Sequence, residues 1–408
     1  MSTLSIVPYF NFARTKMISQ AIHHEAGAAM IQVTPDLRYR PRCHDCGSPA
    51  GTIHSNGYRR IIRDLSMGDT KILLQVGYRK IWCNQCSAAR VEQLSFADAS
   101  KRITCRLARY VYELCKTMTV EDVARHLDLD PKTVKAVDKI FLEKEFGQTD
   151  YTSLRILAID EIALKKGHNY MTVVLDYLTG RVVWMGKGRS KETLDEFFFG
   201  MTNEQKDAIE AVAIDMWEAY INRIRHHCPN AKIVFDMFHV VQAFGRVVDE
   251  VRREEYFNAT LKDRMVMKGS RYLLLRNSVN LSAEQRGKLD KLLKINATLH
   301  AVYVLKDQLK IIYHYSRRHA AKRALDNWCL MAEDVDHPAL KRFVKRLRFF
   351  EYGILNHCNY SIGTSKLEGV NNKIKLIKRK AYGYHDDNYF SLKVKQAFAG
   401  KKSTNFIG

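Results

Sequence analysis

Four of the nine cysteines are spaced as metal ligands. They form two Cys-x-x-Cys pairs, Cys43 with Cys46 and Cys83 with Cys86. Each pair can place two thiolates on one tight turn, and two such turns supply the four sulfur ligands that Zn²⁺ prefers. The spacer of 36 residues between the pairs is longer than usual. The pattern predicts a structural zinc site, with a redox pair or coincidental thiols as the competing interpretation.

Carboxylates at the ends of apolar segments form a second candidate metal site. Asp160 and Asp215 each end a predicted buried strand. If the two strands are parallel neighbours, the carboxylates lie a few Å apart, and charges that close need a cation between them. Two Mg²⁺ ions about 3.5–4 Å apart can activate the attacking oxygen and stabilise the leaving oxygen at a phosphodiester. Glu368, on a predicted helix at about 364–380, is the candidate third carboxylate.

Each of these carboxylates also has a structural explanation. Asp at a strand end is often a turn former or a helix cap. The segment from Ser365 to Glu368 fits a capping box, in which Glu368 would only accept a backbone N–H. Asp236 and His239 either position DNA or water near the metals or simply begin a helix. Asp176 fits a turn role.

Predicted strands and helices would position these residues. The cysteine spacer contains two predicted strands, at 57–63 and 71–76, joined by a turn at 67–69, which fits a zinc ribbon with a long hairpin. In the second half, three meandering strands followed by strands that alternate with helices predict a mixed sheet covered by helices. Residues 246–344 are almost purely helical in pattern and interrupt the sheet.

Residues 104–146 predict three short helices. Thr119 begins the second helix, and Asp130 followed by Pro131 begins the third. This is the spacing of a helix-turn-helix, whose last helix enters the major groove of DNA. A plain three-helix connector with a solvated lysine face is the alternative. The candidate DNA contacts on the last helix are Lys132, Thr133, Lys135 and Lys139.

The composition favours a nucleic-acid partner. Lys and Arg number 66 against 44 Asp and Glu, a net charge of +22 over 408 residues, which indicates a polyanionic partner. The excess lies in residues 38–102, 246–344 and 345–408, with sums of +7, +8 and +9. The last region contains a run of candidate DNA contacts: Lys373, Lys375, Lys378, Arg379 and Lys380.

The chain shows no sign of membrane insertion or export. No apolar run reaches the ~18 residues of a membrane-spanning helix. The first ten residues lack the basic start of a signal peptide. Metal-type cysteine pairs and an odd cysteine count favour a reducing compartment. We therefore expect a cytoplasmic protein that does not bind membranes.

Together, these motifs resemble bacterial insertion-sequence transposases of the ISL-three type over nearly the whole chain. Besides the cysteine pairs and the helix-turn-helix, the resemblance is carried by segments 158–161, 213–215, 234–241, 268–276 and 365–375. It implies a ribonuclease H-like core with an Asp-Asp-Glu triad, matched here by Asp160, Asp215 and Glu368. It also implies an Asp-x-x-His motif, matched by Asp236 and His239, and cut-and-paste transposition of an element bounded by terminal inverted repeats.

With this resemblance, we expect a multidomain, helix-rich α/β enzyme. Its parts would be an N-terminal arm (1–37), a zinc-binding domain (38–102), a helix-turn-helix domain (103–150), a ribonuclease H-like core (151–245 with 345–408) and a helical insertion (246–344). It would use Mg²⁺ or Mn²⁺ for cleavage and strand transfer and Zn²⁺ for structure. It would act in the bacterial cytoplasm, at the nucleoid when bound, as at least a dimer on inverted-repeat and target DNA.

Two other functions would use the same parts. A non-catalytic zinc and helix-turn-helix regulator derived from a transposase would bind DNA equally with and without Mg²⁺ and cut nothing. A structure-specific nuclease on the same core would cut DNA without needing the sequence of the terminal repeat. The presence of all three carboxylates argues against the regulator.

Overall fold

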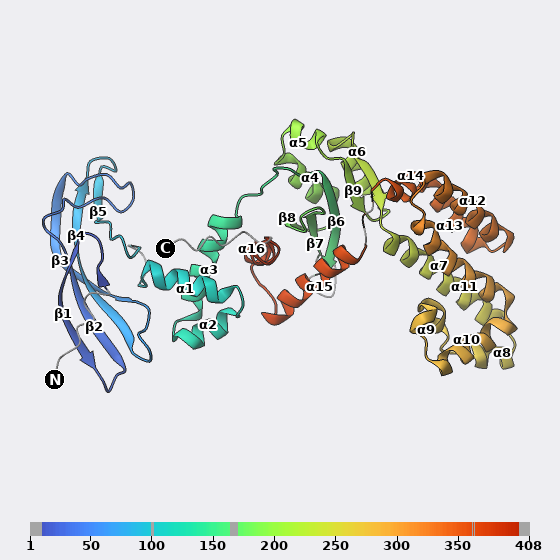
Figure 1. Ribbon diagram of the computed structural model, residues 1–408, viewed down its shortest axis with the longest axis horizontal. Coiled ribbons are helices and arrows are strands. Elements are labelled where there is room, and N and C mark those ends of the chain that lie inside the picture. Colours follow the sequence, from blue (N-terminus) through green and yellow to red (C-terminus); the bar gives the residue numbers. More distant parts are fainter. Residues whose placement is uncertain (1–9, 99–101, 164–169, 361, 363, 400–408) are drawn as a thin grey trace. The chain divides into compact units, whose positions relative to one another are not determined.

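The computed structural model describes residues 10–98, 102–163, 170–360, 362 and 364–399. The chain forms two compact units, 1–145 and 146–408, and each has its own hydrophobic core. The first unit contains a sheet and helices α1 to α3, and the second contains another sheet and all later helices (Figure 1). The finer domain boundaries expected from the sequence stay predictions.

The first unit is built on a five-stranded sheet in the order β1-β2-β4-β3, with β5 paired to β4. The antiparallel pairing of β3 with β4 and a turn at Met67–Thr70 confirm the predicted hairpin. A second hairpin, β1–β2, was not predicted, and β2 joins the sheet parallel to β4. The strands are β1 (Thr15–His23), β2 (Ala28–Pro35), β3 (Thr52–Arg63), β4 (Lys71–Cys83) and β5 (Ala88–Val91).

Three helices follow this sheet, as predicted: α1 (Cys105–Cys115), α2 (Val120–Leu127) and α3 (Pro131–Phe146). The Thr119 hydroxyl accepts a hydrogen bond from the Asp122 N–H at 3.1 Å and so caps α2. The Asp130 carboxylate accepts from the Lys132 N–H at 2.8 Å and caps α3. Side-chain oxygens at these positions satisfy backbone donors that a helix start leaves unpaired.

The second unit contains a five-stranded mixed sheet in the order β10-β9-β6-β7-β8, which confirms the predicted mixed sheet. β6, β7 and β8 form an antiparallel meander, and β9 and β10 run parallel to β6. The strands are β6 (Ile156–Ala163), β7 (Tyr170–Asp176), β8 (Val182–Lys187), β9 (Ala211–Ile214) and β10 (Lys232–Phe235).

Helices cover both faces of this sheet. On one face, Leu157 and Val212 pack in a core with Phe197 of α4 (Lys191–Phe199) and Ile224 of α6 (Glu218–His227), near the short α5 (Asn203–Asp207). On the other face, the core contains side chains from β6, β9 and two C-terminal helices, α15 (Thr364–Lys380) and α16 (Asp387–Ala397). The predicted inward face of α15 is confirmed, because Ile374 is fully buried there. α16 was not predicted.

The predicted helical region between β10 and α15 is confirmed. It begins with α7 (Met237–Asn258), which follows β10 after a single residue, and its core includes Phe244, Trp328 and Phe343. No helix in the described part of the chain is both long and apolar enough to cross a membrane. Short 3₁₀ turns lie at 278–280, 312–314 and 356–358. The other helices of the region are α8 (Leu261–Met267), α9 (Arg271–Leu275), α10 (Ala283–Ile295), α11 (Ala297–Ile311), α12 (Arg318–Asp334), α13 (Pro338–Phe349) and α14 (Glu351–Leu355).

Candidate functional site

Asp160 and Asp215 follow the segments in which β6 and β9 pair. β6 and β9 pair in parallel, with Ala158 opposite Ala213. Asp160 and Asp215 each lie two residues beyond this last paired position, Asp215 just after the end of β9. Asp160 does not end its strand as the sequence predicts, because β6 continues to Ala163. Because side chains alternate between the faces of a strand, Asp160 lies on the face of Ala158, which α15 and α16 cover. Neighbouring strands are about 4.8 Å apart. The parallel pairing that the expectation required is therefore present, and the joint metal site of the two aspartates stays a prediction.

Asp236 extends the row of carboxylates to a third strand. β10 pairs in parallel with β9, with Phe235 opposite Ile214, and Asp236 and Asp215 are the residues that follow these two strand ends. The carboxylate of Asp236 also caps α7 by accepting from the Phe238 N–H at 2.9 Å. Its pKa is raised, mainly by burial and also by the charges of Asp160 and Asp215. Asp236 therefore begins a helix, and its part in positioning DNA or water stays a prediction. We call Asp160, Asp215 and Asp236 the acidic row.

Hydrogen bonds orient the first two carboxylates of the row. Asp160 Oδ2 accepts from Asn371 Nδ2 of α15 at 2.5 Å, and Asp160 Oδ1 accepts from the Glu161 N–H at 2.8 Å. Asp215 Oδ1 accepts from the Met216 N–H at 2.6 Å, while half of its side chain stays exposed. The orientation of Asp160 thus depends on α15, a helix more than 200 residues away in the chain.

The structure places His239 beside Asp215 and places Glu368 on the exposed side of α15. His239 Nδ1 is 3.9 Å from Asp215 Oδ2. Glu368 is exposed on α15, three residues before Asn371, and residues at that spacing share one side of a helix. The alternative role of Glu368 in a capping box involves Ser365, whose side chain lies outside the described residues. Among the described residues, only the four cysteines form a group of three or more His, Cys, Asp or Glu side chains placed to hold an ion.

Glu161 and Asn371 are site residues that the sequence analysis did not single out. Alternation along β6 directs Glu161 to the face opposite Asp160. Burial, together with the charges of Asp160 and Asp215, raises the pKa of the Glu161 carboxyl to about 7, and Arg189 opposes this shift. The position of an acid directly after Asp160 was a visible signal for Glu161. Nothing local marked Asn371, because its role depends on how α15 packs.

The four cysteines of the first unit meet as predicted. The Sγ atoms of Cys43 and Cys86 are 3.9 Å apart, and those of Cys46 and Cys83 are 3.5 Å apart. All four sulfur atoms lie within 4.8 Å of one another. Tetrahedral Zn–S bonds of about 2.3 Å correspond to S–S separations of about 3.8 Å. The residues present therefore fit a zinc ion at the end of β4.

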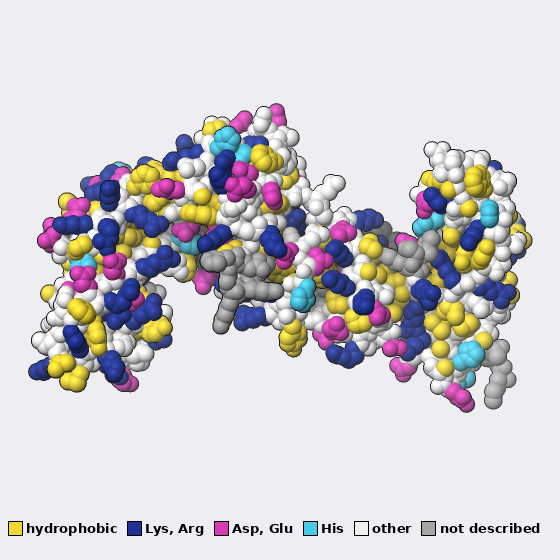
Figure 2. Space-filling view, turned by 180° about the vertical axis from the view of Figure 1, so that it is seen from behind, with side chains coloured by type: hydrophobic (Ala, Val, Ile, Leu, Met, Phe, Trp, Pro, Cys, Tyr) yellow, Lys and Arg dark blue, Asp and Glu magenta, His cyan; other side chains and the backbone are white. Residues whose placement is uncertain are grey.

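The predicted DNA contacts differ in their surroundings. On α3, Lys132 is exposed, and Lys139 Nζ lies 4.0 Å from Glu143. On α15, Lys373 Nζ donates to the Ala397 carbonyl at 2.6 Å, whereas Lys375 is exposed. Figure 2 shows Lys and Arg side chains spread over the visible face and mixed with Asp and Glu. Charge alone therefore does not outline one DNA-binding surface.

Comparison with known proteins identifies the class and then the family. Residues 157–394, which include the acidic row and α15, match a family described as transposase, and residues 92–139 match the helix-turn-helix domain of transposase family ISL3. The second match contains α1, α2 and most of α3. These matches define a transposase, an enzyme class that cuts DNA and transfers its strands, with a DNA-binding helix-turn-helix.

Two curated relatives support the assignment over most of the chain. The transposase for insertion sequence element IS1001 of Bordetella parapertussis is 42% identical over 362 residues, which cover 88% of this chain and 89% of the relative. The transposase for IS1557 of Mycobacterium tuberculosis is 26% identical over 403 residues, 93% of this chain and 90% of the relative. The chain belongs to the ISL3 family of insertion-sequence transposases, in agreement with the resemblance found in the sequence.

Proposed function

We propose that this transposase excises and inserts an insertion sequence by a cut-and-paste route, with Asp160, Asp215 and Glu368 as its Asp-Asp-Glu triad. The observation that carries the proposal is the parallel pairing of β6 with β9, because Asp160 and Asp215 each lie two residues beyond the last paired position of these neighbouring strands. Carboxylate oxygens are the ligands that Mg²⁺ and Mn²⁺ prefer. When bound, the ions would activate the attacking oxygen and stabilise the leaving oxygen at each phosphodiester.

The sheet supports a ribonuclease H-like core. A meander of three antiparallel strands is followed by two strands parallel to the first, and the first strand, β6, lies in the middle of the sheet. The first triad position falls on that central strand and the second on its parallel neighbour. Helix α15, which carries Glu368, follows the helical region in the chain and packs against β6. The family resemblance implies this order, with an insertion before the Glu.

The chain's own residues would prepare the site in defined ways. Asn371 holds one oxygen of Asp160 through its amide, and the Glu161 N–H holds the other. Three carboxylates in adjacent strands repel one another, and the raised pKa of Asp236 reflects that repulsion together with burial. A divalent cation would relieve the repulsion. Glu368 would reach the same region from one helical turn before Asn371.

The other parts of the proposal concern DNA. The helix-turn-helix, with Lys132, Thr133, Lys135 and Lys139 on α3, would read the terminal inverted repeats together with the cysteine-bearing domain. The cations of α15 would contact the strand near the acidic row. Two element ends must be joined, so we propose a homodimer or higher oligomer on DNA, acting in the bacterial cytoplasm.

A strand-transfer assay tests the proposal. The purified chain would be mixed with a duplex ending in the terminal inverted repeat of its own element and with a target plasmid. We expect cleavage and insertion with Mg²⁺ or Mn²⁺ and neither reaction with Ca²⁺. Glu368→Gln should bind the duplex but not cut it. Glu196→Gln, an exposed substitution on α4 across the sheet, is the matched control and should cut normally.

Two outcomes would contradict the proposal. Normal cleavage by Glu368→Gln would remove Glu368 from the triad. Equal duplex binding with and without Mg²⁺, with no nicking of any substrate, would instead favour the non-catalytic regulator. Cleavage of random duplexes as fast as repeat-bearing duplexes would favour the structure-specific nuclease.

The zinc site gives a separate prediction about stability. Cys46→Ser should lower bound zinc from one ion per chain to nearly none, because a hydroxyl is a poor substitute for a thiolate. Structural zinc contributes about 10 kcal/mol or more to the folding of small zinc domains, so the first unit should melt at least ~10 °C lower. Elemental analysis and calorimetry measure the two effects. Cys105→Ser, at the exposed start of α1, should change neither, and zinc retention by Cys46→Ser would disprove the four-sulfur site.

A further inference from the structure

A cavity of about 610 Å³ lies between the end of β6 and the C-terminal half of α15. Its apolar lining comes from Ile162 and Ala163 of β6, Ile374 of α15 and Phe390 of α16, and the turn residues Tyr382 and Gly383 complete it. Ile162, Ile374 and Phe390 are almost fully buried members of one core. The apolar floor is therefore a rigid part of the fold. Its volume lies within the usual range of small-molecule sites.

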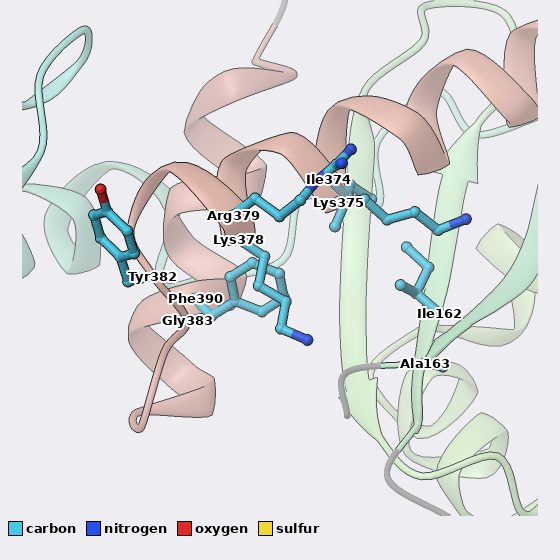
Figure 3. Close-up of a pocket in the computed structure, with 9 residues that line it drawn as sticks. All are labelled: Ile162, Ala163, Ile374, Lys375, Lys378, Arg379, Tyr382, Gly383 and Phe390. Atoms are coloured by element: carbon cyan, nitrogen blue, oxygen red, sulfur yellow. The ribbon is translucent and has the colours of Figure 1, made fainter. Parts of the chain in front are cut away.

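Three cationic side chains line the cavity beside these apolar residues. Lys375, Lys378 and Arg379 line the cavity, and none of its lining residues is an Asp or Glu. None of the three forms an ion pair with another side chain in the described part of the chain. Figure 3 shows Lys375 and Lys378 extending from α15 toward the side on which Ile162 lies. A ligand that fits must combine negative charge with a flat or apolar part.

The cavity is next to the acidic row. Ile162 follows Asp160 by two residues and therefore lies on the same face of β6. Ile374 follows Asn371, the residue that holds Asp160, by three residues on the same side of α15. A single DNA strand whose phosphate reaches the acidic row can thus place a neighbouring nucleotide at the cavity.

We propose that this cavity receives one unpaired nucleotide of the bound DNA, with its base on the apolar floor and its phosphates on Lys375, Lys378 and Arg379. This inference builds on the proposed function, because it concerns DNA at the acidic row. A paired base cannot enter, since its ring is stacked within the duplex and must leave the stack to reach an enclosed site. Apolar and aromatic side chains accept such bases with little sequence preference.

The test measures binding without added divalent ions, so it does not depend on cleavage. Two otherwise identical duplexes are compared, one with a 2-aminopurine paired to thymine and one with the 2-aminopurine unpaired as a single-nucleotide bulge. We expect the chain to bind the bulged duplex about tenfold more tightly, as one stacked base contributes. The fluorescence of its 2-aminopurine should change on binding, and that of the paired probe should not.

Filling the cavity should abolish this preference. Lys375 is exposed and extends from α15 toward Ile162, so Lys375→Trp would occupy the cavity without replacing a core side chain. Leu376→Trp is the matched control, because Leu376 is exposed on α15 but does not line the cavity. The control should keep both the tenfold preference and the fluorescence change. Lys378→Glu should also remove the preference, and it replaces Lys375→Trp in the test if that variant does not fold.

Two results would overturn the inference. The first is equal affinity of the unaltered chain for the two duplexes. The second is a preference that survives both Lys375→Trp and Lys378→Glu, because the unpaired base would then be bound elsewhere. If the unaltered chain prefers the bulged duplex but does not cleave DNA, the result would count against the proposed triad and not against the cavity.

Discussion

Asp215→Asn should lower the rate of DNA strand cleavage by about a thousandfold or more while leaving DNA binding intact. Asparagine has nearly the same shape but no charge, so the row would keep its hydrogen bond to Met216 and lose the charge that attracts a divalent cation. Metal ions contribute several kcal/mol to the transition state of such reactions, and about 4 kcal/mol corresponds to a thousandfold change in rate. Single-turnover cleavage on a denaturing gel and a gel-shift titration measure the two properties.

Asp176→Asn is the matched control for this substitution. Asp176 also ends a strand of the same sheet, but β7 runs antiparallel to β6, so Asp176 lies at the opposite edge. Its carboxylate accepts from the Leu178 N–H at 3.1 Å and from the Thr179 hydroxyl at 2.5 Å, which confirms its predicted turn role. We expect this variant to cut DNA normally. Equal losses in both variants would show that a strand-ending charge matters for folding and not for catalysis.

The comparison of Asp215 with Asp176 shows which features of the site can be predicted from the sequence. The apolar run that leads to each carboxylate is a local feature that sequence alone reveals. The end of the strand is less certain, because β6 continues past Asp160 to Ala163. Which carboxylates share an edge depends on strand direction and neighbours. The sequence analysis could state the parallel pairing of the strands of Asp160 and Asp215 only as a condition, and the structure supplies it.

The hairpin β1–β2 shows why other parts of the fold were missed. Most side chains of β1 are exposed or half-buried, so no regular burial pattern marks it as a strand. β2 has a buried alternation at Ala29, Ile31 and Val33, but that face is completed by β4, about 40 residues later in the chain. The spacing of residues within β2 does not reveal which strand, about 40 residues later in the chain, will pair with it. Helix α16 was missed for the same reason. Its buried residues, which include Tyr389, Phe390 and Leu392, pack against elements far away in the sequence, such as β8.

The two site residues found only in the structure have the same explanation. Asn371 is polar, half-buried and on a helix whose apolar face was predicted correctly, yet its partner is Asp160. The contact requires β6 and α15 to pack together across the whole helical region. Glu161 stands directly after Asp160 in the sequence, but its pKa is raised mainly because its side chain is buried in the folded chain. Sequence patterns identify the elements that carry a site, and long-range packing decides which polar residues complete it.

Replacing Lys375, Lys378 and Arg379 together with glutamine should reduce the salt dependence of DNA binding. Each phosphate contact made by a cation releases counterions and contributes about 0.9 to the slope of log affinity against log salt concentration. If all three cations contact phosphates, the slope should fall by about 2 to 3, and affinity at moderate salt should fall about a hundredfold. Fluorescence anisotropy with a repeat-bearing duplex at several salt concentrations measures both. Lys373 is left unchanged because its ammonium group already donates to the Ala397 carbonyl.

A charge-matched variant separates this surface from a general loss of positive charge. Lys288, Lys341 and Arg342 are exposed cations of the helical region, and each already forms an ion pair, with Glu284, Asp336 and Glu250 respectively. A cation that is already paired gains less from a phosphate, so replacing these three with glutamine should change the slope by less than about 1. Equal loss of slope in the two triple variants would mean that α15 has no special role. An unchanged slope in the α15 variant would remove the cations over the cavity from the DNA-binding surface.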